Sequence, residues 1–420
     1  MKRISKALAL IMALCMVVAL CACGKTEAPA AETPAAADAP AEASAASAGK
    51  ITIFQQKAEI ADDLKTLAAK YTEETGVEVE VWAQAGDDYY TNLKTSLSSE
   101  SGPSVFTLNS DAEITEVKDY LADLADLTFL DKIDATLLAS RDGKTVGIPM
   151  TAEGFGLVYN KGLIDVADLS STDALVALIE ANGKEPNTLG MSQESYFLAG
   201  HMFNFPFAMQ DNPVEFCQKV FSGEVKLADV PEFQQYAQIL SAIRANQVNP
   251  IEVTYDNNCG DFATGKTAMI HQGNWAWGVI SAFENLPEMG ITGLPLNGNT
   301  KIAVGVPSVW AVNADAPAEE QKLAKDFLNW LYTSETGVDY LMNVFGFIPV
   351  VAGMTSENMD PLSAAVAEAC ATGNVLPWTF NTEWPAGIID TELAPITEQF
   401  FSSDMSEGEY LEAINAAFLK

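Results

Sequence analysis

The sequence predicts an α/β protein built as two lobes. Short β-rich runs alternate with helix-spaced apolar residues from Ile51 onward, a pattern typical of parallel sheets covered by helices. The chain beyond residue 49 holds about 370 residues, which is too long for one ordinary hydrophobic core and long enough for two. The segment before it lacks this alternation, so we expect the globular part to begin near Lys50.

Residues 1–22 have the pattern of a secretory signal peptide. Three basic residues precede an uncharged apolar run over residues 7–20. This run is shorter than the roughly 18 residues that span a bilayer. The following Leu-Cys-Ala-Cys resembles the lipobox of bacterial lipoproteins, which implies cleavage before Cys23 and a diacylglycerol on its sulfur. The alternative is that Cys23 is one more small residue of the run, as Cys15 and Cys21 are.

Residues 24–49 predict a flexible, disordered linker. Of these 26 residues 12 are Ala and three are Pro, with almost no large apolar side chain. Burial therefore cannot offset the entropy lost on ordering them. As a flexible coil the linker would separate its ends by roughly 30 Å. A lipid on Cys23 would hold the globular part close to the outer face of the bacterial cytoplasmic membrane.

The chain is strongly acidic. Residues 1–22 carry three of the 23 basic residues and none of the 57 acidic ones, so the remainder has a net charge of −37. Such a surface favours solubility and repels nucleic acid. We expect no nucleic-acid partner and a monomeric protein.

Metal and nucleophile chemistry have few residues to draw on. Cys217, Cys259 and Cys370 lie far apart without a CxxC spacing, which predicts free thiols and leaves their redox state open. The only histidines are His201 and His271, and no HExxH motif is present. The sequence predicts no metal, no cofactor and no Ser-His-Asp triad, and a structural role for His201.

The elements of the first lobe follow from residue spacing. The expected order is strand 51–54, a helix ending at Gly76, strand 77–82, helix 88–99, strand 104–108 and a helix from Glu113. Because ligands of parallel sheets lie beyond the carboxyl ends of strands, Gln55 and Asn109 are candidate donors to a ligand.

The elements of residues 145–420 also follow from residue spacing. We expect a strand pair from 145–149 and 151–161, then a largely helical stretch over 173–283. A β-rich segment at 301–313 precedes a helix at 319–331, and the pattern from Pro361 is again helical. No internal repeat is found.

Several segments together resemble the extracellular solute-binding proteins that feed sugar importers. They are Gly-Lys-Ile-Thr-Ile at 49–53, Tyr-Thr-Glu-Glu-Thr-Gly-Val-Glu-Val at 71–79, Gly-Leu-Val-Tyr-Asn-Lys at 156–161, Gly-Lys-Thr-Ala-Met at 265–269 and Trp-Ala-Trp at 275–277. The resemblance runs from about residue 49 to the C-terminus and is closest to the maltose-binding protein branch. It implies a two-lobe periplasmic-binding-protein-like fold with a hinge, a ligand in the cleft and an ABC permease as partner. Lobe one would be 50–152 plus 308–354, and lobe two 153–307 plus 355–420.

The resemblance also assigns site residues. Asp111 matches a sugar-binding Asp, Glu153 the Glu after the first hinge strand, and Trp275 a stacking Trp. Glu194 and Tyr196 match a Glu and aromatic pair of lobe two, and a second stacking Trp is best matched by Trp384, with Trp378 as the rival. The maltose-binding pattern has Asp-Lys where this chain has Ala58-Glu59, an Arg at Ala112 and a Trp at Leu108, which places maltodextrin in doubt.

These residue types suit a sugar. Carboxylates accept charge-assisted hydrogen bonds from hydroxyls, and aromatic rings cover the apolar C–H faces of a pyranose. Structural alternatives remain open: Asp111 as the N-cap of the helix at Glu113, Glu153 and Glu194 as solvated or helix-capping carboxylates, and Trp277 as a core residue. The expected function is carbohydrate capture for an ABC importer. The alternatives are a binding protein for a polyamine, peptide or glycerophosphodiester, and a glycoside hydrolase.

Overall fold

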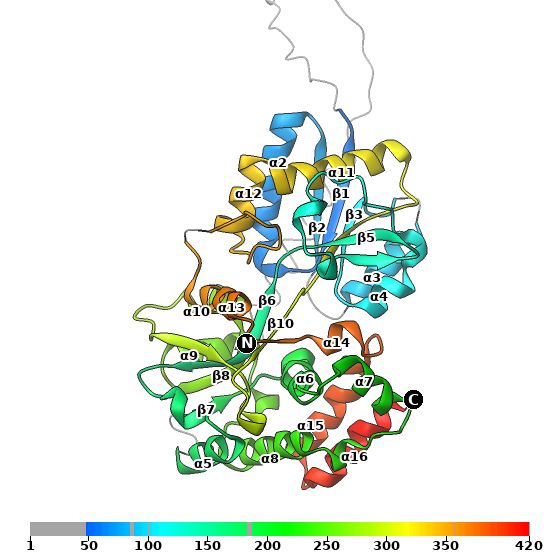
Figure 1. Cartoon of the computed structure of the whole chain (residues 1–420). Coiled ribbons are helices and arrows are strands. Elements are labelled where there is room, and N and C mark those ends of the chain that lie inside the picture. Colours follow the sequence, from blue (N-terminus) through cyan, green and yellow to red (C-terminus); the bar gives the residue numbers. More distant parts are fainter. Residues whose placement is uncertain (1–47, 85–87, 100, 183–186, 357, 420) are drawn as a thin grey trace, which may run out of the picture. The chain divides into compact units, whose positions relative to one another are not determined.

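The computed structural model describes residues 48–84, 88–99, 101–182, 187–356 and 358–419. The signal peptide, Cys23 and nearly all of the linker lie outside the described residues. The chain from Ser47 onward forms one compact unit, and it contains two β-sheets with helices on their faces (Figure 1). The predicted α/β class is confirmed.

The first sheet has the strand order β2-β1-β3-β11-β5-β4. Its strands are β1 Lys50–Gln55, β2 Glu78–Ala83, β3 Val105–Leu108, β4 Ala139–Arg141, β5 Lys144–Pro149 and β11 Val309–Val312. β1 pairs in parallel with β2 and β3, whereas β11 is antiparallel to β3 and β5. The parallel core predicted from the early strand–helix alternation is therefore present.

The second sheet has the order β12-β10-β6-β8-β7, and β9 also pairs with β6. Its strands are β6 Glu153–Asn160, β7 Asn187–Gly190, β8 Thr267–Gly273, β9 Met289–Thr292, β10 Ile302–Gly305 and β12 Val375–Pro377. β7 is parallel to β8 and β12 is parallel to β10, while β6 is antiparallel to β8 and β10.

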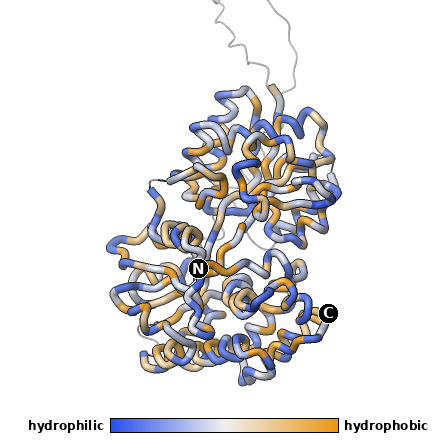
Figure 2. The backbone as a smooth tube through the Cα atoms, viewed as in Figure 1, coloured by the Kyte–Doolittle hydropathy of each residue, from blue (hydrophilic) through white to orange (hydrophobic). Residues whose placement is uncertain are grey.

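The α-helices cover the faces of both sheets. They are α2 Ala61–Thr75, α3 Tyr89–Leu97, α4 Asp111–Glu116, α5 Thr172–Asn182, α6 His201–Ala208, α7 Pro213–Phe221, α8 Pro231–Asn246, α9 Tyr255–Ala263, α10 Trp277–Ile280, α11 Ala318–Thr333, α12 Glu335–Asp339, α13 Pro361–Thr372, α14 Thr379–Thr382, α15 Ala394–Ser402 and α16 Glu407–Phe418. α2 and α11 share a core with one face of the first sheet, and α3 and α4 share a core with its other face. Figure 2 shows how hydrophobic and hydrophilic positions are distributed along the elements.

α2 illustrates how the sequence sets these elements. Its buried residues Leu64, Leu67, Ala68 and Tyr71 recur at helical spacing and face the sheet. The helix ends at Gly76, which has the left-handed φ of 75° that a side chain would disfavour. Both the spacing and the stop agree with the sequence-based expectation.

The chain crosses between the two sheets three times, at 149–153, 305–309 and beyond Ile348. The first and third crossings are bonded to each other. The Ile348 N–H donates to the Thr151 hydroxyl at 3.0 Å, and the Ala152 N–H donates to the Ile348 carbonyl at 3.2 Å. Because few backbone segments join the lobes and they hydrogen-bond together, this region has the construction of a hinge.

The structure corrects parts of the sequence-based element assignment. The expected strand pair at 145–149 and 151–161 is wrong, since β5 and β6 belong to different sheets. The expected helical stretch 173–283 contains β7 and β8, whose residues are buried throughout and so show no alternation. The β-rich segment 301–313 is likewise divided between β10 and β11. Among the described residues no helix is long and apolar enough to cross a membrane.

Candidate ligand-binding site

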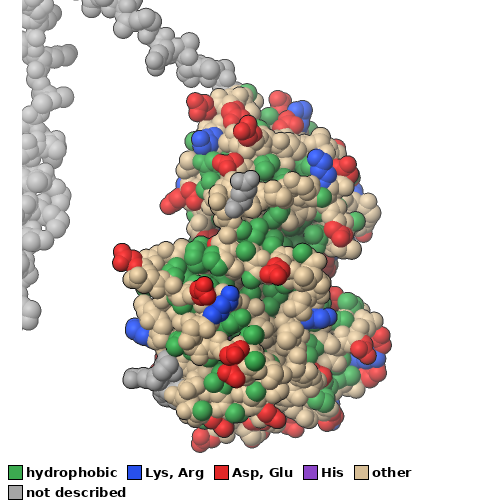
Figure 3. Space-filling model, turned by 60° about the vertical axis from the view of Figure 1, so that its left-hand side comes forward, with side chains coloured by type: hydrophobic (Ala, Val, Ile, Leu, Met, Phe, Trp, Pro, Cys, Tyr) green, Lys and Arg blue, Asp and Glu red, His purple; other side chains and the backbone are tan. Residues whose placement is uncertain are grey.

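The sheet edges at the crossings carry the candidate site. In the first sheet, Leu108 pairs with Val309 and Val309 with Pro149, so the carboxyl ends of β3 and β5 lie where the chain leaves this lobe. In the second sheet, Phe155 at the start of β6 pairs with Gly273 at the end of β8. The carboxyl ends of strands in both lobes therefore meet at the hinge, where ligands of α/β sheets bind. Figure 3 shows hydrophobic side chains exposed along the waist between the lobes.

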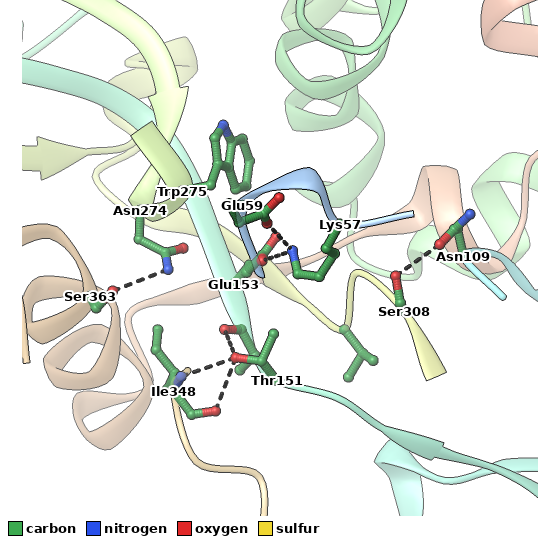
Figure 4. Close-up of polar contacts among 12 residues, drawn as sticks. Lys57, Glu59, Asn109, Thr151, Glu153, Asn274, Trp275, Ser308, Ile348 and Ser363 are labelled. Atoms are coloured by element: carbon green, nitrogen blue, oxygen red, sulfur yellow. Dashed lines mark hydrogen bonds and ion pairs between the residues drawn. The ribbon is translucent and has the colours of Figure 1, made fainter. Parts of the chain in front are cut away.

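A buried lysine occupies the centre of this region. The Lys57 ammonium lies 2.6 Å from Glu153 Oε1 and 2.8 Å from Glu59 Oε1, and its side chain is 10% exposed. Figure 4 shows it between the two carboxylates. Burial alone would lower the pKa of Lys57, but the Glu153 and Glu59 charges outweigh it and raise that pKa. Lys57 is not among the predicted site residues, although its position just after β1 is one where ligands of α/β sheets bind.

Gln55 and Asn109 lie at the strand ends as expected. Gln55 is completely buried, its Oε1 accepts from the Lys57 N–H at 2.5 Å, and its Nε2 has no partner among the described residues. Asn109 Oδ1 accepts a hydrogen bond from the Ser308 hydroxyl at 2.8 Å. The Ser308–Asn109 bond joins the end of β3 to the second crossing between the lobes.

Asp111 lies at the first position of α4 and is exposed. Its Oδ1 is 2.5 Å from Arg141 Nη2. The N-cap of α4 is Ser110, whose hydroxyl accepts from the Glu113 N–H at 3.2 Å. The alternative that Asp111 caps this helix is therefore wrong, and its charge is compensated by Arg141 from the neighbouring β4.

Glu194 is engaged by the protein itself. Its Oε1 accepts from the Tyr255 N–H at 2.8 Å, at the first residue of α9, so the carboxylate complements the positive end of that helix. The second oxygen, Oε2, is buried without a partner among the described residues. Oε1 of Glu194 therefore caps α9, as the sequence-based alternative predicted, and Oε2 takes no part in this capping.

Trp275 is fixed at its polar edge and supported on one face. Its indole N–H donates to Gln272 Oε1 at 2.9 Å, and Gln272 is completely buried. A Cβ at Gly273 would lie 2.4 Å from the Trp275 ring, so only a glycine allows the indole to rest there. Trp275 is itself partly exposed. Trp275 is among the predicted site residues, whereas Gln272 and Gly273, which orient its indole, are not.

Trp384, predicted as a second stacking tryptophan, is buried. Trp384 is 3% exposed and its ring lies 5.0 Å from Phe207 and 5.4 Å from Phe418, inside the core of the second lobe. Trp384 is therefore a core residue of the second lobe, and its ring also lies 6.2 Å from Phe380. Its rival Trp378 stacks on Phe380 at 5.3 Å and lies 6.4 Å from Trp275, and it is 5% exposed.

Tyr196 is the most exposed aromatic residue of this region. It is 37% exposed and its ring lies 5.8 Å from His201 and 6.2 Å from Phe380. Together with Trp275 it presents flat apolar area next to the hinge. Within the described ranges no group of three or more His, Cys, Asp or Glu residues is arranged to hold a metal ion.

A family model of bacterial extracellular solute-binding proteins matches residues 66–369. The chain belongs to this family. The resemblance found in the sequence is thereby confirmed, and the family acts outside the cytoplasm. Because its members are binding proteins, the glycoside hydrolase alternative is set aside.

Solved structures share the same two-lobe fold. RafE from Streptococcus pneumoniae is 18% identical, covering 89% of this chain and 98% of that chain, with a TM-score of 0.68. A sugar transporter protein from Bacillus licheniformis in complex with stachyose is 16% identical, covering 88% and 100%, with a TM-score of 0.70. The maltose/maltodextrin-binding domain MalE from Bdellovibrio bacteriovorus, bound to maltotriose, is 17% identical, covering 88% and 98%, with a TM-score of 0.64.

Proposed function

We propose that this protein captures an oligosaccharide outside the cell and delivers it to the permease of an ABC importer. The observation that carries the proposal is the combination of aromatic and neutral polar side chains at the strand ends beside the hinge. Trp275 and Tyr196 offer partly exposed rings, and the Gln55 amide and Asn109 lie at the facing strand ends. The aromatic rings can pack against the apolar C–H faces of a pyranose, and the amides can hydrogen-bond to its hydroxyls.

The charge at the site disfavours an anionic ligand. Lys57 is paired with both Glu153 and Glu59, and Arg141 with Asp111, at distances of 2.5 to 2.8 Å, so the Lys57 cluster has one negative charge in excess. An anion would have to break one of these ion pairs, whereas the hydroxyls of an uncharged ligand can donate to the carboxylates without doing so. Structural relatives with raffinose, stachyose and maltotriose are consistent with a sugar.

Binding would proceed by closure of two lobes. Lobe one comprises 50–152 plus 308–354, and lobe two comprises 153–307 plus 355–420, in keeping with the two sheets and the bonded crossings. A ligand that contacts both lobes stabilises the closed form by its differential affinity for it. Small-angle scattering should report a more compact particle with ligand than without it, and identical profiles would count against closure.

The protein would be anchored by a lipid on Cys23. The linker then gives the cleft a reach of roughly 30 Å from the membrane, which suffices for a permease in the same membrane. This places the protein, as a monomer, at the outer face of the bacterial cytoplasmic membrane.

A thermal-shift screen on the chain without residues 1–46 tests the proposal, because the rest forms one compact unit. The panel comprises raffinose, stachyose, maltotriose and chitin oligosaccharides, with spermidine and a glycerophosphodiester as rivals. Ligand at 100 times its Kd adds about 2.7 kcal/mol of stability, which shifts the melt measurably. A shift with a sugar supports the proposal, and a shift with the rivals alone would overturn it.

A further inference from the structure

His201 lies in a cup of aromatic rings at the site. It is the first residue of α6 and follows the π-helical turn Tyr196–Gly200. Six rings surround its imidazole, with centroid distances of 4.5 Å for Phe155, 5.1 Å for Trp275, 5.2 Å for Phe380, 5.4 Å for Phe197, 5.8 Å for Tyr196 and 6.1 Å for Trp378. We call this set the aromatic cup.

One side of the aromatic cup is buried, and another side is partly exposed to solvent. Phe155 is fully buried and stacks on the imidazole at an interplanar angle of 18°, and Trp378 and Phe380 are each 5% exposed. Tyr196 is exposed, and Trp275 is partly exposed. The cup therefore opens beside the strand ends that face the hinge, where the proposed function places a ligand.

The imidazole brings hydrogen-bonding capacity into this apolar setting. His201 is 7% exposed, and its Nδ1 is fully buried without a hydrogen-bond partner among the described residues. Nδ1 alone of the two ring nitrogens is in this state, so Nε2 is the nitrogen left to meet a ligand. An unpartnered polar atom buried among aromatic rings is uncommon in native structures and distinguishes His201 from the apolar residues around it.

The imidazole is held in its neutral form. Burial, and to a smaller extent the neighbouring His271, lowers the pKa of His201 well below its usual value. A neutral imidazole carries one N–H and one lone pair. With the proton on Nε2, the buried Nδ1 keeps only a lone pair, and the donor points to the less enclosed side.

We propose that His201 is a ligand-binding residue, whose Nε2–H donates a hydrogen bond to an oxygen of an uncharged sugar ring that packs against Trp275 and Tyr196. The inference rests on the proposed function and adds to it a donor and a chemical class of ligand. An apolar cup with a neutral donor suits a ring with C–H faces and acceptor oxygens. A quaternary ammonium would use the same rings through cation–π contacts but would gain nothing from the N–H donor.

Two substitutions separate binding from packing. His201→Phe keeps a ring to stack on Phe155 and removes both nitrogens, whereas His201→Gln keeps an N–H donor near the Nε2 position. The matched control is His271→Gln, because His271 is 1% exposed and lies on β8 behind the cup. Isothermal titration uses the sugar of the panel that shifts the wild-type melt most, with choline as the charged probe.

The expected result is a loss of about tenfold in affinity for His201→Phe, the size of one good hydrogen bond. His201→Gln should recover part of it, and His271→Gln should change it less than twofold. Wild-type sugar affinity in His201→Phe overturns this inference alone, and so does tighter binding of choline than of any sugar. No sugar binding by the wild type overturns the proposed function and this inference with it.

A second readout does not require the variants to fold. The chain has only two histidines, so a protein labelled with ¹⁵N-histidine gives two imidazole spin systems. Sugar should shift the Nε2 resonance of His201 and leave that of His271 nearly unchanged. Unchanged His201 resonances at a saturating sugar concentration would overturn the inference.

Discussion

Lys57 donates a hydrogen bond to Glu153 at 2.6 Å and thereby ties the segment after β1 to the first residue of β6. Lys57 follows a strand of the first sheet and Glu153 begins a strand of the second, and each side chain is 10% exposed. Glu59 shares the same ammonium at 2.8 Å. A cluster of one ammonium and two carboxylates is therefore built into the place where the lobes join, and removing Lys57 would leave the Glu153 carboxylate buried without a counter-charge.

Lys57→Met should be strongly destabilising. The substitution keeps an apolar stem but leaves the Glu153 carboxylate buried without a counter-charge, which costs about 3 to 5 kcal/mol. Urea unfolding at pH 7 measures the loss. The matched control is Lys65→Met, because Lys65 pairs with Asp62 at 2.9 Å on an exposed surface and should cost less than about 1 kcal/mol. Equal losses for the two variants would mean that the cluster is not specially stabilising.

The thiols should differ sharply in reactivity. Cys217 and Cys259 are buried, and burial raises the pKa of each thiol to about 12, whereas Cys370 is exposed. Since the thiolate is the reactive form, an aromatic disulfide reagent should titrate one thiol quickly in the native chain lacking residues 1–46. The other two should react after unfolding in urea. Fast reaction of two or three thiols in the native protein would contradict this assignment.

How much the sequence predicts depends on whether the pattern is local. The spacing of Leu64, Leu67 and Tyr71 and the stop at Gly76 gave α2 correctly, because helical periodicity and a left-handed cap are local properties. The fully buried strand β7 gave no such pattern and was hidden inside a predicted helical stretch. Which strands pair is also not local, and so β5 and β6 were wrongly joined.

The site shows the same division. Gln55 and Asn109 were predicted at the ends of parallel strands, and they lie at the last residue of β1 and directly after β3, because the carboxyl end of a strand is a position that sequence can indicate. Lys57 was missed, since its importance depends on Glu153, which lies 96 residues away. Trp384 was assigned to stacking, yet its ring packs on Phe207 and Phe418, contacts that the sequence does not disclose.

The stability of the protein should fall as the pH rises through neutrality because of Glu113. Burial raises the pKa of this carboxyl to about 7, even though its carboxylate accepts the Asn109 N–H at 2.7 Å. A folded-state pKa above the unfolded value gives stability that is complete below about pH 4.5 and lost as the pH rises through 7. Between pH 5 and pH 8 the loss should be about 2 kcal/mol.

Urea unfolding at these pH values tests this linkage. Glu113→Gln should flatten the pH dependence, while Glu368→Gln, at an exposed position on α13, should leave the wild-type slope intact. Identical slopes for the wild type and Glu113→Gln would show that Glu113 has an ordinary pKa in the folded protein. The comparison must be made without ligand, since ligand adds its own stabilisation.

Cys23→Ala should release the protein from the membrane without changing its ligand affinity. The lipid would be attached through the Cys23 sulfur, whereas the candidate site lies in the compact unit that begins at Ser47. Fractionation of cells gives the location, and titration calorimetry gives the affinity. Cys21→Ala is the neighbouring control and should remain in the membrane fraction. A Cys23→Ala protein that stays membrane-bound would contradict the proposed anchor.

Trp275→Ala should weaken sugar binding by about 1 to 3 kcal/mol, as expected for the lost burial of a large ring. Trp277 is a suitable control, because it lies two residues further on and packs against the cluster of Phe262 and Ile280, whereas Trp275 packs also against the core that contains Phe155. Trp277→Ala should lower the melting temperature but leave the affinity of the folded protein nearly unchanged. Titration calorimetry and thermal unfolding of both variants separate the two effects. If the two variants lose affinity equally, the loss comes from disturbed folding around β8, and Trp275 does not stack on the ligand.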